Sequence, residues 1–316
     1  MSTSLTHDVA VIGGGAAGLS AAVTLARSLR SVVVVDAGEP RNAPAAGAHN
    51  VLGREGVAPL ELLATGRAEA RHYGAEIRAD GAVAARHLDT GFEVDLAGGD
   101  TLRVRRLILA TGLVDELPAI PGVRELWGRS VLHCPYCHGW EVRGTRIGVV
   151  GTSPMSVHQT LLFRQLSDQV TLFLHTMPDP DDEAWAQLAA LDVQVVTGEV
   201  SELRAQDGEL RSVALADGQV VDVDSVVVAP RFHARGDLYA QLGGTLVDHP
   251  FGEMVPADPS GRTEVTGVWA AGNAHDLAAT VAGAAAAGVV AGGAVNADLV
   301  TADAQAAVRS RRSVGR

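Results

Sequence analysis

The chain has 316 residues, a formal net charge of −12 and a hydrophobic content of 47%. This length exceeds one hydrophobic core and predicts two domains, and the acidic balance argues against nucleic acid or an anionic membrane as a partner. With no run of about 18 uninterrupted apolar residues and no leader-like start, we expect a cytoplasmic protein that acts on small molecules and does not bind a membrane.

The first elements predict a dinucleotide-binding unit. Residues 8–11 form an apolar strand, followed by a glycine turn at 13–18 and a helix over 19–26. The next strand, 31–35, ends in Asp36, which lies 18 residues after Gly18, near the spacing of an acid that holds an adenosine ribose. A glycine pattern alone would be weak, but here strand, turn, helix, strand and acid occur in order. The residues assigned to this site are Gly13, Gly15, Ala16, Ala17, Gly18, Asp36 and Ala37.

Two later strands also end in turns of small residues. The first ends at Ala110, Thr111 and Gly112, and the second ends at Gly272 and Asn273, before an Ala/Gly-rich helix over about 277–297. Both strands also read as ordinary sheet core. Arg41 and Asn42 follow the acid-ended strand, where they either contact the cofactor or form a solvated loop.

A second nucleotide-type segment has an incomplete dinucleotide-binding fingerprint. The chain enters this segment after residues 118–122 and leaves it near 229–231. Its first strand, 146–150, runs into Gly151-Thr152-Ser153-Pro154, without the two further glycines of a phosphate turn. Its next strand, 169–174, leads to His175-Thr176-Met177, without an arginine for a 2′-phosphate. The sequence therefore predicts that NADP(H) binds weakly, if it is used at all.

Both cysteines of the chain lie in the run His133-Cys134-Pro135-Tyr136-Cys137-His138. Two cysteines at this spacing with flanking imidazoles favour dithiol–disulfide exchange. The same letters match a c-type haem attachment site, but that chemistry belongs to exported proteins. Zinc would need a second group of ligands elsewhere, so we expect no metal, and a purely structural disulfide is rare in an intracellular protein.

Taken together, these motifs resemble the low-molecular-weight thioredoxin reductases over nearly the whole chain. Gly13, Gly15 and Gly18 match that family's FAD pyrophosphate loop, and residues 49–53 resemble its flavin-contacting segment. Three departures stand out: His138 replaces an acid, Asn273 replaces an aspartate, and the NADPH signatures are eroded. These changes are similar to those of the FAD-dependent dithiol oxidases of the gliotoxin, holomycin and romidepsin type. The resemblance adds Asn50, Ala110, Thr111, Gly112, Gly272 and Thr280 to the FAD site.

The resemblance implies an α/β fold with two Rossmann-like domains, of which the FAD domain is discontinuous. We expect the FAD domain at 1–115 and 231–300, the domain carrying the C-x-x-C pair at 116–230, and a frayed tail at 301–316. By family position, Cys137 is the flavin-facing thiolate and Cys134 exchanges with substrate. His138 is the acid/base, and His133 is a weaker candidate for that role.

The function expected from this resemblance is oxidation of a small-molecule dithiol, with FAD as cofactor, oxygen as acceptor and a homodimer as the assembly. Two alternatives remain open at this point. One is an NADH- or NADPH-dependent reductase of a thioredoxin-like protein, and the other is a non-catalytic flavoprotein sensor, which the intact C-x-x-C pair disfavours.

Overall fold

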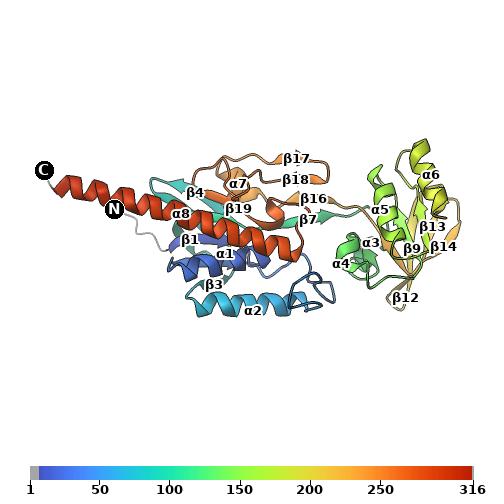
Figure 1. Cartoon of the computed structure of the whole chain (residues 1–316), viewed down its shortest axis with the longest axis horizontal. Coiled ribbons are helices and arrows are strands. Elements are labelled where there is room, and N and C mark those ends of the chain that lie inside the picture. The colour runs from blue at the N-terminus through green and yellow to red at the C-terminus, as the bar shows by residue number, and fades with distance from the viewer. Residues whose placement is uncertain (1–6, 315–316) are drawn as a thin grey trace.

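The computed structural model describes residues 7–314, which form two α/β bodies at opposite ends of an elongated molecule (Figure 1). The larger body contains the first and last parts of the chain. Its strands are β1 (His7–Ile12), β2 (Val32–Asp36), β3 (Glu76–Ala79), β4 (Ala82–Leu88), β5 (Gly91–Leu96), β6 (Thr101–Leu109) and β19 (Val268–Ala270). Its helices are α1 (Ala16–Arg27), α2 (Pro59–His72), α7 (Asp237–Gln241) and α8 (Val281–Val314), with the 3₁₀ helix η1 (Gly272–Ala274).

The sheet of this body has the strand order β3-β2-β1-β6-β5-β4, and β19 pairs with β6. Strands β3, β2, β1, β6 and β19 are parallel neighbours, with Val11 opposite Val34 on one side and Ile108 on the other. The valine run of β2 is buried on both faces, which is typical of a parallel sheet covered on each side. Helices α1 and α8 form a hydrophobic core with one face of the sheet. Helix α7 and the strands β4 to β6 contribute to a second core on the other face.

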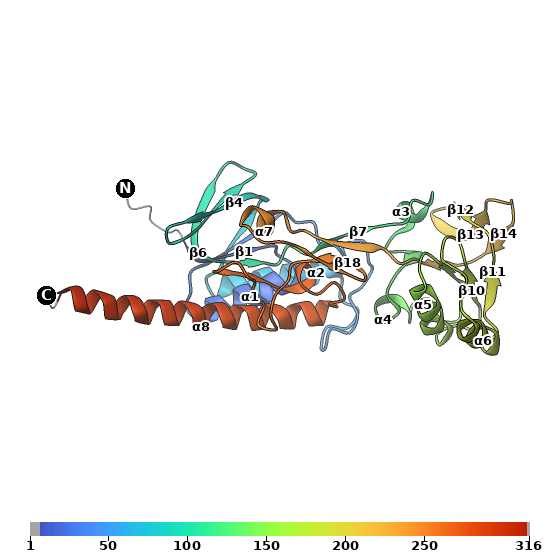
Figure 2. The ribbon, with the colours of Figure 1, turned by 90° about the horizontal axis from the view of Figure 1, so that it is seen from above.

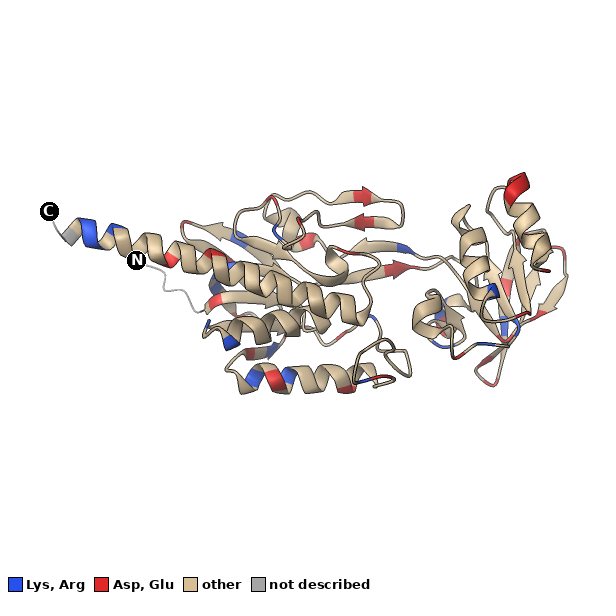
Figure 3. Ribbon diagram, viewed as in Figure 1, with Lys and Arg blue, Asp and Glu red and all other residues tan. Residues whose placement is uncertain are grey.

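Helix α8 packs closely against α1 because both helices present small residues. A side chain at Gly288 would collide with the backbone of Ala17, and one at Gly292 would lie 3.0 Å from the carbonyl oxygen of Ala21. Figure 3 shows the first half of α8 without charged residues and basic residues near its C-terminal end. By length and composition alone α8 could cross a membrane, but its early part belongs to the core of this body.

The predicted tail is instead a continuation of α8. The helix expected over about 277–297 begins at Val281 and runs to Val314, so residues 301–314 are helical, and residues 303–313 are exposed (Figure 2). One cause is local, because the segment is rich in alanine, and the other is distant, because Asp303 forms ion pairs with Arg30 and Arg105.

The smaller body holds the middle of the chain. Its helices are α3 (Val123–Leu126), α4 (Pro135–His138), α5 (Met155–Arg164) and α6 (Asp182–Ala190). Its strands are β8 (Val131–Leu132), β9 (Ile147–Val150), β10 (Val170–Phe173), β11 (Gln194–Val196), β12 (Val200–Gln206), β13 (Glu209–Leu215), β14 (Val220–Asp222) and β15 (Ser225–Val227). A parallel sheet has the order β11-β10-β9-β15-β8, and β12, β13 and β14 form an antiparallel sheet.

Two antiparallel strands connect the bodies. The chain leaves the larger body along β7 (Leu113–Glu116) and returns along β16 (Arg231–Ala234), which pair with Asp115 opposite Phe232. With β17 (Val247–His249) and β18 (Gly252–Met254) they form a sheet of order β17-β18-β16-β7. The larger body is therefore discontinuous in sequence, and the predicted α/β architecture is confirmed.

Candidate active site

The turn between β1 and α1 exposes the start of α1 to a cavity. Gly13 has a φ of +106°, and a side chain on Gly13 or Gly18 would collide with backbone carbonyl oxygens. A side chain on Gly15 would meet nothing within 4 Å, because this residue borders open space. Gly15 is also the N-cap of α1 and supplies no side-chain hydrogen bond there, so the first N–H groups of α1 are available to an anion such as a pyrophosphate.

This cavity has a volume of about 1570 Å³ and extends from the larger body to the C-x-x-C pair. It brings together residues that are far apart in sequence. The predicted site residues in its wall are Gly13, Gly15, Ala16, Ala17, Asp36, Ala37, Arg41, Asn42, Ala110, Thr111, Gly112, His133, Cys134, Cys137, His138, Gly272, Asn273 and Thr280. Gly18 lies behind the turn and supports it, and Asn50 reaches the C-x-x-C helix instead.

Asp36 ends β2 at the cavity wall, where a ribose-binding acid is expected. One carboxylate oxygen accepts a hydrogen bond from the backbone N–H of Gly38 at 3.2 Å, and the other lies 3.7 Å from an Arg67 nitrogen. Because neither contact uses all of the carboxylate's lone pairs, Asp36 can still accept hydrogen bonds from two sugar hydroxyls. The glycine turn and Asp36 thus fit the adenosine diphosphate half of a dinucleotide.

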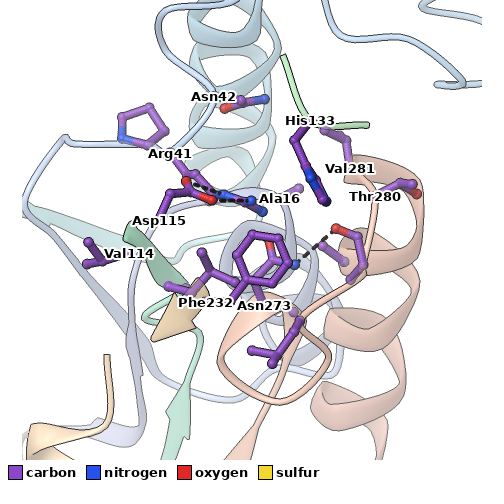
Figure 4. Close-up of a pocket in the computed structure, with 18 of the residues that line it drawn as sticks. Ala16, Arg41, Asn42, Val114, Asp115, His133, Phe232, Asn273, Thr280 and Val281 are labelled. Atoms are coloured by element: carbon purple, nitrogen blue, oxygen red, sulfur yellow. Dashed lines mark hydrogen bonds and ion pairs between the residues drawn. The ribbon is translucent and has the colours of Figure 1, made fainter. Parts of the chain in front are cut away.

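The last turn of this site explains why an asparagine replaces the expected aspartate. The Asn273 amide nitrogen donates hydrogen bonds to the carbonyl oxygens of Asp276 at 2.9 Å and Ala279 at 3.0 Å. An ionised aspartate has no proton to donate and would face both carbonyl oxygens unfavourably. Asn273 therefore holds the segment that leads to Thr280 and the start of α8, which also face the cavity (Figure 4).

The two cysteines flank the first turn of α4. Cys134 is the N-cap residue, Pro135 begins the helix, and both thiols are free and half-buried. A hydrogen bond from the Cys137 thiol lowers the pKa of Cys134 to about 6, although burial opposes this shift. Hydrogen bonds from the backbone N–H groups of Cys137 and Tyr136 and the charge of Arg41 lower the pKa of Cys134 further. The hydrogen bond between the two thiols, burial and the Cys134 charge raise the pKa of Cys137. In the reduced pair these shifts favour Cys134 as the thiol that loses its proton first, and the flavin-facing role expected of Cys137 stays a prediction.

The two flanking histidines lie in different surroundings. Burial lowers the pKa of His133, whose Nδ1 lies 3.1 Å from the carbonyl oxygen of Val228. A carbonyl only accepts, so Nδ1 carries the proton and Nε2 is the acceptor. Burial also lowers the pKa of His138, with the charge of His49 adding to the effect and that of Glu141 opposing it. His138 is thus neutral at neutral pH and able to accept a proton.

A loop of the larger body holds the C-x-x-C helix in place. Asn50 donates from its amide nitrogen to the carbonyl oxygen of Tyr136 at 2.7 Å. Next to it, His49 lies 3.4 Å from Glu141 and 2.7 Å from Glu55. The sequence indicated the segment that contains His49 and Asn50, but not the contact between His49 and Glu141, which forms only where the two bodies meet.

Arg41 lies in the cavity wall and is paired there with an acidic side chain from a connecting strand. Its guanidinium binds both carboxylate oxygens of Asp115, at 2.8 and 2.6 Å, and lies 5.0 Å from the ring of Phe232 (Figure 4). Sequence reasoning missed Asp115 and Phe232 because both lie within connecting strands. It also assigned no role to His158, which lies in the cavity wall on α5.

The first residue of the turn after β9 is packed against the loop after β10. A side chain at Gly151 would collide with Met177, and the backbone N–H groups of Thr176 and Met177 both donate to the Gly151 carbonyl oxygen. His175 has a φ of +46°, and its Nδ1 accepts a hydrogen bond from the Val200 N–H at 3.1 Å. The ring that replaces a phosphate-binding arginine is therefore turned to the protein's own backbone.

Within residues 7–314, no group of three or more His, Cys, Asp or Glu side chains is arranged to hold a metal ion. The site is thus built from the glycine turn, two thiols and their neighbouring imidazoles.

Comparison with known proteins relates this site to a family. A model for the pyridine nucleotide-disulphide oxidoreductases matches residues 7–288. The chain is 36% identical to thioredoxin reductase tcpT of Claviceps purpurea (strain 20.1), with 86% of this chain and 88% of the relative covered. It is 33% identical to thioredoxin reductase sirT of Leptosphaeria maculans, with 84% and 86% covered.

Among solved structures, the crystal structure of HlmI is similar with a TM-score of 0.91 and 46% identity, covering 98% of each chain. An oxidoreductase from Agrobacterium tumefaciens gives a TM-score of 0.89 and 36% identity, covering 94% of this chain and 99% of that one. The predicted resemblance to thioredoxin reductase-like flavoproteins is confirmed, and it implies a bound flavin. The chain is a member of the pyridine nucleotide-disulphide oxidoreductase family.

Proposed function

We propose that the protein is an FAD-dependent dithiol oxidase, which closes a disulfide in a small-molecule dithiol and passes the electrons to oxygen. The observation that carries the proposal is the contrast between the two nucleotide-type turns. The turn at Gly15 has the full glycine pattern and opens into the cavity shared with both cysteines, whereas the turn at 151–154 has a single glycine, packed under Met177, with Thr152 and Ser153 at the wall of the same cavity. A route for electrons from thiols is therefore favoured over one from a nicotinamide.

FAD is the flavin that the site fits. The N-terminus of α1 provides N–H groups for a pyrophosphate, and Asp36 provides acceptors for a ribose, so the dinucleotide form of a flavin uses both. When bound, FAD supplies a two-electron acceptor beside the dithiol and passes the electrons on to oxygen, which becomes hydrogen peroxide.

Substrate oxidation begins with the enzyme disulfide between Cys134 and Cys137. A substrate thiolate attacks the Cys134 sulfur, so a mixed disulfide forms and Cys137 leaves. The second substrate thiolate then attacks the substrate sulfur of the mixed disulfide, which releases the cyclic disulfide and frees Cys134. Two electrons now reside in the enzyme dithiol. His138, neutral at neutral pH, is placed to take a proton from an attacking thiol, because the thiolate is the reactive form.

The low pKa of Cys134 suits it to the exchanging position. A thiol with a pKa near the ambient pH is both a good leaving group and a good nucleophile. Two large apolar side chains in the cavity wall, Tyr136 and Met155, are more than half exposed and offer apolar surface to a small organic substrate. The cytoplasmic location, the homodimeric state and the lack of nucleic-acid and membrane partners belong to the same proposal.

A second candidate is an NAD(P)H-dependent reductase of a thioredoxin-like disulfide. It is favoured by the names of the relatives, which are thioredoxin reductases. In that case a nicotinamide cofactor binds beside the turn at 151–154, where Thr152 and Ser153 border the cavity in place of the missing glycines.

Oxygen consumption separates the two candidates. With a small dithiol and no nicotinamide, the oxidase consumes oxygen and forms one hydrogen peroxide per disulfide. A reductase does so only slowly, and it needs NADPH and a protein disulfide for turnover.

A further inference from the structure

Arg41 is fixed in one orientation by Asp115. Two nearly parallel hydrogen bonds join the guanidinium to both carboxylate oxygens, at 2.8 and 2.6 Å. The Asp115 side chain is only 8% exposed, so the pair is largely withdrawn from solvent. Such bidentate pairs are both strong and directional. The ion pair uses two of the five guanidinium N–H groups and fixes the direction of the other three.

The same guanidinium reaches the C-x-x-C pair through an aromatic contact. It lies 5.0 Å from the centre of the Phe232 ring, and the Phe232 and His133 rings form a T-shaped pair with their centres 5.3 Å apart. Figure 4 shows the Phe232 ring between the Arg41–Asp115 pair and His133. His133 directly precedes Cys134, so the positive charge of Arg41 lies on the side of the cavity that carries the cysteines.

The charge of Arg41 acts on three titrating groups there. It lowers the pKa of Cys134 and acts in the same direction on Cys137 and His133. At His133 the carboxylate of Asp115 opposes it.

Other polar groups lie near the dithiol or elsewhere in the wall of the same cavity. They are the N–H groups of Tyr136 and Cys137, the imidazoles of His133, His138 and His158, the His49–Glu141 pair from the docking loop, and Arg231 in the cavity wall.

We propose that Arg41 is a positioning residue for the dithiol: Asp115 holds its guanidinium beside the C-x-x-C pair, where its charge stabilises the Cys134 thiolate. This inference rests on the proposed redox use of the two cysteines, and it gives Arg41 a role beyond the expected contact with FAD. A more stable thiolate leaves more readily in thiol–disulfide exchange, so Arg41 assists the resolution of the mixed disulfide, in which Cys134 is the leaving group.

The test measures the thiolate directly, without substrate or turnover. In FAD-loaded protein carrying Cys137→Ser, Cys134 is the one thiol left in the chain. The pH dependence of its alkylation by iodoacetamide, in which the thiolate displaces iodide, reports its pKa. Arg41→Met is expected to raise this midpoint by about 0.5–1 pH unit, less than an uncompensated charge because Asp115 is nearby. Arg41→Lys, which keeps the charge, is expected to leave the midpoint close to that of the protein with Arg41.

Two further variants keep the test decisive. Arg41→Met strands a buried carboxylate, so the pair Arg41→Met/Asp115→Asn removes that penalty and must still raise the midpoint. Arg231→Met removes a cation from the same cavity wall and must leave the alkylation midpoint unchanged. An unchanged midpoint in both Arg41→Met proteins, or an equal rise in Arg231→Met, overturns the inference. If Arg41→Met loses the absorbance of bound FAD while the midpoint is unchanged, Arg41 binds the cofactor and does not act on the thiol. None of these outcomes depends on whether the enzyme is an oxidase.

Discussion

Asn50 donates a hydrogen bond from its side-chain amide to the backbone carbonyl of Tyr136 at 2.7 Å, and this bond joins the larger body to the helix between the two cysteines. The neighbouring His49–Glu141 contact, at 3.4 Å, joins the same two segments. The loop at 47–49 also lines the cavity that holds the glycine turn. One loop therefore borders the cofactor site and fixes the dithiol beside it.

Asn50→Ala is expected to slow electron transfer between the dithiol and the flavin by roughly 2- to 10-fold, which corresponds to the loss of one net hydrogen bond. FAD should stay bound, because its cradle lies elsewhere. Stopped-flow bleaching of the flavin by a small dithiol measures the rate. Gln219→Ala, on an exposed turn of the smaller body, serves as the control. An unchanged rate in Asn50→Ala would mean that this bond does not position the helix.

Cys134→Ser and Cys137→Ser are each expected to abolish turnover while FAD remains bound. The reason is that the electron pair passes through a disulfide, which needs both sulfurs. Oxygen consumption with a dithiol measures turnover, and the visible absorbance of the purified protein reports the flavin. Turnover that survives in either variant would show that substrate thiols react with the flavin without the C-x-x-C pair.

His138→Ala is expected to slow the thiol steps by roughly 10²- to 10⁴-fold. Burial lowers the pKa of His138, so in the wild type the active, neutral imidazole persists to a pH below its ordinary value and is lost as the pH falls further. The limb of the pH–rate profile below neutrality should therefore flatten in the variant. His133→Ala should have a smaller effect on rate. If the acid limb is the same in His138→Ala, the proton moves through another group.

The lowered pKa of His133 also predicts how stability depends on pH. Below the unfolded value of about 6.5, the unfolded chain takes up a proton that the folded protein resists, so folding stability falls as the pH is lowered through that range. His133→Asn keeps a donor for the Val228 carbonyl and removes the titration. Urea unfolding at about pH 5.5 and 7.5 should show a smaller loss of stability in this variant than in the wild type. His72→Asn, at an exposed position, should retain the full loss, and equal losses in all three proteins would contradict the assignment.

The elements that the sequence predicts well are those with local causes. The order of strand, glycine turn, helix and Asp36 follows from backbone sterics and from the valine runs of a buried sheet, and each is found at the predicted place. The extent of α8 was not predicted, because its outer turns rely on Asp303 contacting Arg30 and Arg105 from distant segments. Local spacing gave no information about such partners.

The candidate active site shows the same division between features with local causes and features that depend on distant partners. The cysteines and their histidines were found from their spacing, but the location of the thiolate depends on Cys134 capping a helix and on Arg41 lying nearby. The Arg41–Asp115 and His49–Glu141 pairs form only when segments 74 or more residues apart meet. In the same way, the covering of Gly151 by Met177 depends on the path of a loop, although the missing glycines had already indicated an altered turn.

The direction of electron flow is tested most directly by anaerobic reduction of the FAD-loaded protein with two donors. A small dithiol should bleach the flavin quickly, and admitted oxygen should restore the colour with release of hydrogen peroxide. NADPH should bleach it slowly or not at all, because the loss of two charge-assisted phosphate contacts weakens binding by roughly 10²- to 10⁴-fold. Cys134→Ser is the control and should lose the response to the dithiol. Rapid bleaching by micromolar NADPH, together with reduction of a thioredoxin-like disulfide, would contradict the oxidase account and favour a reductase.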